Sequence, residues 1–324
     1  MKKNILCQSP VFSGNTHTSA ISETIELAKH ADRLGYQRFW VSEHHNTNAF
    51  ASASPEILCT SIGYQTSQIR IGTGGILLGN YSPLKIAEQA NMLSALFPNR
   101  FDLGIGRAGG SDAKTLRYLE SALLTGNDTF LRFKDLIAFV EHQKSDSVYA
   151  HPKTDSKPEF WVLGTSVQSA KFAAENGLKY SFASFINDEQ CMQAIQTYYQ
   201  YFTPSRYLSS PYINLGIFVV CAEREEKALE LVKPSEAWFV ESFIRGKSTS
   251  FPTLEDAKRM RYSVQEEMIL NHRRKSRYVG TKEQIEATLN HLANSLRIHE
   301  VTLVTIVEHF EDRLQSYKLL ADGI

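Results

Sequence analysis

The chain has 324 residues, 42% of them hydrophobic, and its 35 lysines and arginines equal its 35 aspartates and glutamates. This balance gives no electrostatic reason to expect nucleic acid as a partner, and no apolar run is long enough to span a membrane. The four cysteines lie apart, without the spacing of a metal or redox site, which indicates reduced thiols in a cytoplasmic protein: Cys7, Cys59, Cys191 and Cys221.

Strands and helices alternate along the first third of the chain. Strand-type runs at 4–8, 38–42, 69–77 and 101–106 are separated by helices at 18–34, from 54 onward and at 82–96. Apolar residues recur in the first helix at close to a 3.6-residue period, and proline opens the other two. Short joints between such elements favour right-handed βαβ units and a parallel sheet.

The alternation loosens after Arg107 and resumes later. We expect helices at 113–124 and 128–141, then strands at 160–163, 179–185, 212–221 and 300–307. The stretch at 222–297 is predicted to be mostly helical. Eight strands in this order predict one α/β domain over residues 1–324, a (β/α)8 TIM barrel with insertions after strands 4 and 7.

Glu43, His44 and His45 follow the second predicted strand, at the end where such barrels build their sites. Since neighbouring strand residues point to opposite faces, the two imidazoles cannot both face one small site. The spacing of a zinc site is absent, so no metal is expected. One imidazole is expected at the barrel mouth, where it transfers protons near neutral pH, and the other caps the strand.

Glycines mark the ends of the third and fourth strands. Those at 72–75 would let a flat ligand approach the backbone, although a turn or bulge explains them equally. The segment Gly104–Gly109 matches the pattern GxGxxG. Three strands precede it and no strand ending in an acid follows at the required distance, so we do not expect a dinucleotide there.

Arg107 and a later strand-to-helix junction carry groups that bind anions. The junction holds Thr165, Ser166 and Ser169, whose hydroxyls and nearby free amides suit an anion. Taken alone, the arginine is typical of an ion pair and the junction of an ordinary helix cap. Together, on adjacent strand ends, they favour a phosphate.

In several segments the chain resembles the bacterial luciferase-like, flavin-dependent monooxygenase family. The resemblance is dense over residues 1–110, patchy to 220 and thin beyond, and the chain is more similar to the single-chain enzymes of small-molecule metabolism than to the light-emitting pair. The matching segments are 27–36, 38–46, 54–56, 69–78, 83–89, 99–107, 163–166 and 279–281.

The resemblance implies reduced FMN at the barrel mouth, supplied by a separate NAD(P)H-flavin reductase. The flavin would react with O2 to give a C4a-(hydro)peroxide that oxygenates a small organic substrate. His44 matches the family's active-site histidine, with Glu43 as its supporting neighbour. Flavin-binding positions match Gly74 and Gly75, which the family often joins by a cis peptide, and the phosphate-holding positions match Arg107, Thr165, Ser166 and Ser169.

The sequence differs from the family's pattern at two positions, and one of its segments matches the family's lid. Close relatives usually have aspartate where Cys7 stands, a side chain expected to face the barrel interior. Gly106 replaces a cysteine of the light-emitting catalytic subunit, which argues against bioluminescence. The segment 262–278 falls where the family keeps a mobile lid, and its basic run, Arg273-Arg274-Lys275, is interpreted as a solvated face.

Two other functions stay open on the sequence. A deazaflavin (F420)-dependent enzyme that transfers hydride would share the barrel, and a noncatalytic flavin-binding protein would share the cofactor; Glu43-His44 and the lid segment speak against the latter. A homodimer through the helices after strands two and three is plausible. The apolar residues that suit such a face would equally suit packing on the barrel: Ile57, Leu58, Ile62 and Tyr64.

Overall fold

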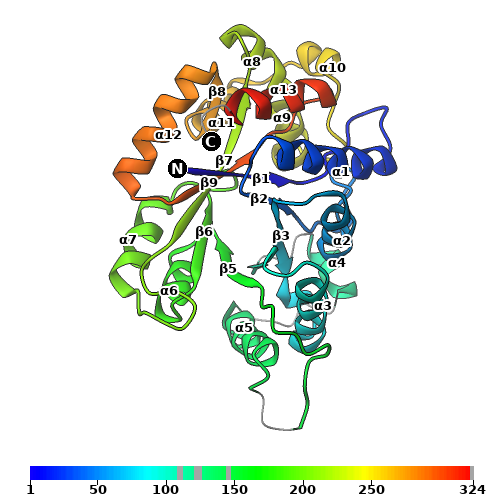
Figure 1. Ribbon diagram of the computed structural model, residues 1–324. Helices are drawn as coiled ribbons and strands as arrows, with labels where there is room; N and C mark the ends of the chain where they lie inside the picture. Colours follow the sequence, from blue (N-terminus) through cyan, green and yellow to red (C-terminus); the bar gives the residue numbers. More distant parts are fainter. Residues whose placement is uncertain (108–111, 120–125, 144–146, 322–324) are drawn as a thin grey trace.

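The computed structural model describes residues 1–107, 112–119, 126–143 and 147–321. Figure 1 looks nearly along a ring of strands that is surrounded by helices. The strands are β1 Lys2–Cys7, β2 Arg38–Val41, β3 Arg70–Leu77, β4 Phe101–Gly106, β5 Glu159–Gly164, β6 Lys179–Ala183, β7 Ile213–Cys221, β8 Arg277–Gly280 and β9 Glu300–Val304.

Eight of these strands close into a parallel barrel. Each of β1 to β6 pairs with the next, β6 pairs with β7, and β9 joins β7 back to β1. The predicted (β/α)8 barrel is confirmed. The ninth strand, β8, was not predicted, because four residues between two helices are too few to show a period. It pairs with the C-terminal half of β7, outside the closed ring.

The helices follow their local signals. Thr16 caps α1 in a capping box with Ser19, while Pro55 and Pro83 open α2 and α3. The predicted helix at 113–124 is observed as α4 up to Tyr118, and residues 120–125 lie outside the described ranges. The helices are α1 His17–Arg33, α2 Pro55–Gln65, α3 Pro83–Leu96, α4 Ala113–Tyr118, α5 Gly126–Val140, α6 Val167–Glu175, α7 Cys191–Tyr201, α8 Glu225–Leu231, α9 Lys233–Phe239, α10 Leu254–Arg259, α11 Val264–Arg274, α12 Lys282–Leu296 and α13 Phe310–Ala321, with short helices η1 Leu78–Asn80 and η2 Val240–Ile244.

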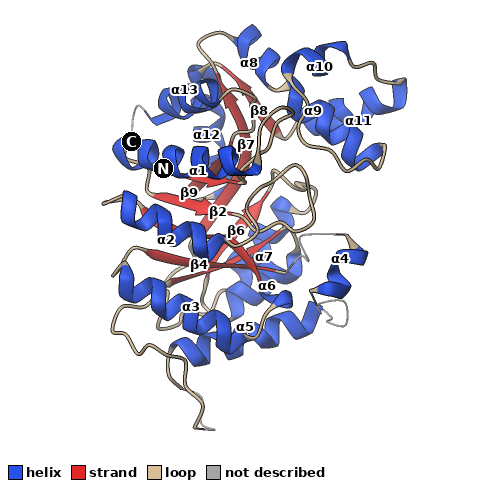
Figure 2. Cartoon of the chain, turned by 90° about the vertical axis from the view of Figure 1, so that its right-hand side faces the viewer, coloured by secondary structure: helices blue, strands red, loops and turns tan. Residues whose placement is uncertain are grey.

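The two insertions stand on one side of the barrel. Figure 2 shows α4 on the same side as α10 and α11, away from the two chain termini. None of the helices in the described ranges is both long and apolar enough to cross a bilayer.

Side chains alternate between the barrel interior and the helix layer, as the two-residue period of a strand requires. In β1, Leu6 packs with Trp40 and Trp161 inside the barrel, whereas Ile5 and Cys7 belong to the core beneath the helices. The Cys7 thiol lies 3.5 Å from Thr24 Oγ1 of α1. The expectation that Cys7 faces the barrel interior is therefore wrong, because its even-numbered neighbours take the inward positions.

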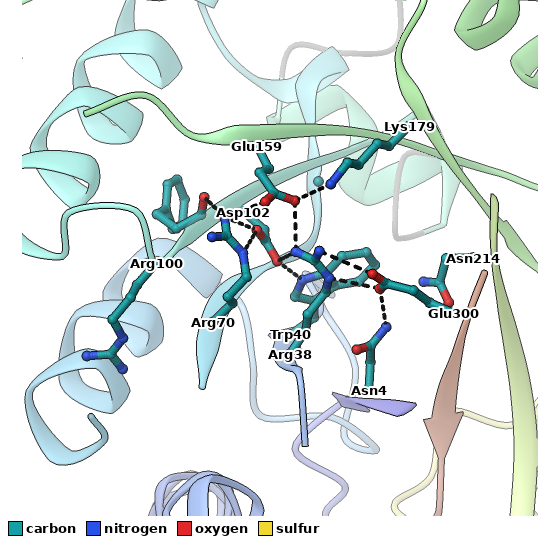
Figure 3. A network of polar contacts seen from close by, with 12 residues as sticks. Asn4, Arg38, Trp40, Arg70, Arg100, Asp102, Glu159, Lys179, Asn214 and Glu300 are labelled. Carbon is teal, nitrogen blue, oxygen red and sulfur yellow. Dashed lines mark hydrogen bonds and ion pairs between the residues drawn. The ribbon is translucent and has the colours of Figure 1, made fainter. Parts of the chain in front are cut away.

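A ring of charged and amide side chains fills the N-terminal end of the barrel (Figure 3). Arg38 donates to Asp102 at 2.7 Å and to Glu300 at 2.8 Å, and it lies 3.0 Å from Glu159. Each barrel strand places one such residue near its start. The ring comprises Asn4, Arg38, Arg70, Asp102, Glu159, Lys179, Asn214 and Glu300.

The apolar residues of α2 divide between the core and the surface. Leu58 and Ile62 pack into the core beneath the helices, whereas Ile57 and Tyr64 are 67% and 69% exposed. Only the latter two are available to a partner, so half of the suggested dimer face is ordinary barrel packing.

Candidate active site

A cavity of about 340 Å³ opens at the C-terminal end of the barrel. It brings together all eight residues that the sequence marked as candidates: Glu43, His44, Gly74, Gly75, Arg107, Thr165, Ser166 and Ser169. Its other lining residues are largely apolar or small and include Leu6, Trp40, Leu77, Gly106, Leu163, Phe185, Ile186 and Gly216. This volume suits a small organic ligand or one part of a cofactor.

Glycines create the room on one wall of the cavity. The Gly74–Gly75 peptide is cis. A Cβ on Gly74 would come within 2.6 Å of Leu6 Cδ1, and one on Gly75 within 2.8 Å of the Gly104 carbonyl oxygen. Because no larger residue fits without moving its neighbours, this wall stays flat and exposes backbone to whatever fills the cavity.

The same geometry explains the GxGxxG match on β4. Gly104 and Gly106 are two positions apart and share the inward face, and Gly106 lines the cavity. A Cβ on Gly104 would lie 2.1 Å from the carbonyl oxygen of Thr73. These glycines thus follow the period of an inward-facing strand rather than a dinucleotide turn. Ala108 and Gly109 lie outside the described residues.

His44 forms part of the cavity wall, and its ring is engaged on three sides. Nδ1 lies 3.1 Å from Ser42 Oγ, Nε2 lies 3.5 Å from the Gln8 amide, and the ring stacks on Phe50 at 4.4 Å between centroids. Burial, with the nearby charge of His45, lowers the pKa of His44 to about 4. The imidazole is therefore neutral at neutral pH.

Glu43 does not support His44 directly, contrary to the expectation from the family. Its carboxylate lies 2.7 Å from His45 Nε2 and accepts from the Leu77 amide at 3.0 Å and the Tyr81 hydroxyl at 2.9 Å. Adjacent side chains diverge at this strand end, so His45 caps the strand while His44 faces the cavity. Glu43 fixes the segment that follows β3.

Arg107 and the start of α6 form a positive corner of the cavity. In the described part of the chain, the Arg107 guanidinium has no ion pair, and its Cζ lies 5.9 Å from the Phe130 ring centroid. Ser166 caps α6 by accepting from the Ser169 amide at 3.3 Å. Ser169 Oγ donates to the Ser166 carbonyl at 2.7 Å and is 2% exposed as a residue. The Val167 amide donates to Gln190 Oε1 at 3.2 Å, so Arg107 and Thr165, beside the positive end of α6, are the groups placed to meet an anion.

An aromatic wall that the sequence did not reveal joins the second insertion to the mouth. Phe50, which stacks on His44, packs on Trp238 and Phe251 at centroid distances of 5.4 Å each. Phe251 is also bound to the N-terminal loop, since its amide donates to the Val11 carbonyl at 2.9 Å. No periodicity joins residues this far apart in the chain, so only the fold could show this wall.

Segment 262–278 comprises α11 and the start of β8, and none of its residues is among those that line the cavity. The prediction that its basic run is a solvated face is wrong for Arg273, which is partly buried, whereas Arg274 is exposed but ion-paired. Arg274 donates twice to Glu236 at 2.7 Å, and Arg273 lies flat on the Phe239 ring. Lys275 is exposed, as expected for a solvated position.

A parallel barrel with a glycine-walled cavity and a positive corner at its C-terminal mouth has the architecture of a small-molecule TIM-barrel enzyme. The sequence profile of the luciferase-like monooxygenases matches residues 1–299, and the chain belongs to this family. Uncharacterized protein YwcH of Bacillus subtilis is 37% identical over 99% of this chain and 98% of its own length. An N-acetyl-S-alkylcysteine monooxygenase of the same species is 30% identical over 100% and 98%.

Solved structures share the whole fold. The crystal structure of apo-MsnO8 is 33% identical, has a TM-score of 0.89 and is aligned over 99% of this chain and 96% of its own. A type II Baeyer-Villiger monooxygenase in complex with FMN has a TM-score of 0.74 at 18% identity, and an F420-dependent secondary alcohol dehydrogenase one of 0.66 at 14% identity. At these low identities the last two show the fold alone.

Proposed function

We propose that this chain works as a single-domain FMN-dependent monooxygenase that oxygenates a small organic substrate. It would receive reduced FMN from a separate NAD(P)H-flavin reductase and use O2. The observation that carries the proposal is the joining, in one cavity, of the flat glycine wall with the positive corner at Arg107 and α6. Relatives named as monooxygenases support it, one of them the oxygenase component of a flavin-dependent trigonelline monooxygenase of Acinetobacter baylyi.

The residues present fit FMN. Gly74 and Gly75 leave a flat surface that a Cβ would fill, which suits an aromatic ring system. Arg107 and Thr165 would hold the phosphate beside the N-terminus of α6, because a guanidinium binds phosphate strongly and the helix dipole favours negative charge there. Reduced FMN, when bound, supplies the electrons that activate O2.

His44 would act at the reacting end of the cavity. Ser42 holds Nδ1 of the neutral imidazole, and Nε2, whose contact with the Gln8 amide is long at 3.5 Å, would donate or accept a proton toward the cavity. The aromatic wall behind it, of Phe50, Trp238 and Phe251, would keep water from the reacting atoms.

The first experiment is an anaerobic titration of the full chain with reduced FMN and, separately, with reduced F420. We expect tight binding of reduced FMN and, after mixing with O2, slower oxidation of the bound flavin than of free flavin. Binding of F420 alone would move the function to hydride transfer. Binding of FMN without oxygen consumption above the free-flavin background, whatever the substrate offered, would indicate a noncatalytic flavoprotein.

The role of His44 has a separate test. In His44→Ala, we expect reduced FMN to bind as in the unmodified protein while more of the consumed O2 appears as hydrogen peroxide. The released peroxide is measured against flavin oxidised. Unchanged oxygenation of an identified substrate with no rise in peroxide would remove His44 from the mechanism.

We also propose that two copies meet through α2 and α3. Exposed apolar side chains lie on these two helices, namely Ile57, Tyr64, Met92 and Leu96. Light scattering of the protein and of a Tyr64→Lys variant tests this: the variant should be monomeric if the face is the interface.

A further inference from the structure

Two arginines near the C-terminal end of β7 have no carboxylate bound to their guanidinium groups among the described residues. Arg273, at the end of α11, has its Cζ 4.1 Å from the Phe239 ring centroid, and Arg277, at the start of β8, has its Cζ 4.1 Å from that of Phe218. Arg277 donates to Ser235 Oγ at 3.0 Å. Within the described ranges, the Nε of each arginine is buried without a hydrogen-bond partner, and no ion pair reaches either guanidinium.

Two of the acids nearby are paired with Arg274, whereas Asp188 acts on Arg273 only through its charge, without a hydrogen bond or ion pair to it among the described residues. Glu236 accepts from Nε and Nη2 of Arg274, each at 2.7 Å, and Glu267 accepts from Nη1 of the same arginine at 2.7 Å. Burial, together with the charge of Arg273, lowers the pKa of Arg277 to about 9, which leaves it protonated at neutral pH. A buried charge without a counter-ion lowers the stability of the fold, and binding of an anion beside the arginines would remove this penalty.

Neither arginine is among the residues that line the cavity, and the pair lies beside it, near the C-terminal ends of β6 and β7. Arg277 is in register with Phe218, which packs in the interior cluster with the cavity-lining Leu6, Trp40 and Leu163. Asp188, whose charge acts on Arg273, comes two residues after Ile186, another lining residue. The arginines thus stand beside β6 and β7, whereas Arg107 stands at the end of β4.

We propose that Arg273 and Arg277 bind a carboxylate of the substrate, and that the substrate is an organic acid with an apolar body. Guanidinium N–H groups match the two oxygens of a carboxylate, and the largely apolar cavity beside them would take the rest of the molecule. This inference rests on the proposed function in that it names the substrate class of the same site. The phosphate of the flavin is the other anion that could reach the pair, and the experiment separates the two.

The test measures binding by calorimetry to the full chain, with a series of aliphatic and aromatic carboxylates of increasing length and their primary amides. We expect the better-fitting carboxylates to bind about tenfold or more tightly than their amides. Arg273→Met and Arg277→Met should abolish this preference, and Lys275→Met, which removes an exposed charge from the same run, should keep it. A preference that survives in both arginine variants, or is missing for every pair in the unmodified protein, would overturn the proposal.

Two further readouts separate binding from structure and from flavin. Without ligand, Arg277→Met should melt at the same or a higher temperature, since it removes a buried unpaired charge, whereas Arg274→Met should melt lower. A fall as large as that of Arg274→Met would make the role structural. Weaker FMN binding with unchanged riboflavin binding would assign the pair to the flavin phosphate instead. Arginine-dependent carboxylate binding in a protein that binds no flavin would leave this inference standing and remove the proposed function.

Discussion

The inward-facing side chains at the two ends of the eight-stranded barrel differ in kind. At the N-terminal end, the inward positions carry charged and amide side chains that bond to one another across the barrel (Figure 3). At the C-terminal end, the last inward positions of β3 and β4 that line the cavity are Gly74 and Gly106. The strand period is the same throughout, so the difference lies only in which residues occupy the inward positions.

The difference separates stability from ligand binding. Arg38, Arg70 and Lys179 balance Asp102, Glu159 and Glu300 at the closed end, three cations against three anions. Burial alone would raise the pKa of Glu159, but these cations hold it at about 2. At the open end, Arg107, Arg273 and Arg277 have no such balance among the described residues. We infer that charges paired within the chain stabilise the fold, whereas the unpaired ones at the open end bind a ligand.

The largest expected effect is on stability and comes from removing the Arg38 guanidinium from the ring at the N-terminal end of the barrel. Arg38→Met should lower the free energy of unfolding by about 3–5 kcal/mol, because Asp102 and Glu300 would stay buried without their main partner. Urea denaturation at neutral pH measures it. As a control, Arg259→Met removes an exposed pair with Glu255 and should cost less than about 1 kcal/mol. Equal losses in the two variants would contradict the comparison.

His44, at the C-terminal end of the barrel, should make the stability of the protein depend on pH. The pKa of His44 is lowered from 6.5 to about 4, so between these values the unfolded chain binds more protons than the folded one. Stability should therefore fall as the pH drops through this window. The unmodified protein should lose about 2–3 kcal/mol more than His44→Gln between pH 7 and pH 4, measured by urea denaturation at each pH. Parallel losses in both proteins would show that His44 does not resist protonation.

The barrel and the cavity were open to prediction because they follow local patterns. The alternation of strands and helices predicts the ring, and strand ends with polar or small residues predict the site. The closed-end ring was missed, although a signal exists. A charged or amide residue recurs near the start of each barrel strand, and in all of them except β1 it comes two positions before an inward glycine, aromatic or small residue, as in Arg38 before Trp40 and Arg70 before Gly72.

Other features could not be read from the chain. The divergence of Glu43 from His44 depends on where β2 ends, and one residue of difference turns each side chain to the other face. Cys7 faces α1 for the same reason. Arg273 and Arg274 look alike in sequence, but only the fold gives Glu236 to one of them.

Removing Arg107 tests the positive corner of the mouth. Arg107→Met should weaken binding of FMN by about 2 kcal/mol, roughly thirtyfold, because a charged hydrogen bond to the phosphate is lost. Riboflavin, which lacks the phosphate, should bind equally to both proteins in a fluorescence titration. Lys171→Met removes a cation from the same side of the barrel, on α6, where it pairs with Glu175, and should leave both affinities unchanged. Equal weakening of riboflavin would place the effect on the ring or on the fold instead of the phosphate.

The smallest expected effect is that of Gly106→Ala, which is compared with the same substitution at a second inward glycine, Gly72. A Cβ on Gly106 would lie 3.2 Å from the flexible end of Leu77, whereas one on Gly72 would lie 2.7 Å from the backbone and Cβ of Asp102. Gly106→Ala should therefore change stability by less than about 1 kcal/mol, yet weaken reduced FMN binding by about fivefold as its methyl enters the cavity. Gly72→Ala should instead lower the free energy of unfolding by about 1–3 kcal/mol, because the backbone cannot give way as a side chain can. If Gly106→Ala destabilises the fold as much as Gly72→Ala, the mouth is packed as tightly as the interior below it, and its glycines serve the barrel rather than a ligand.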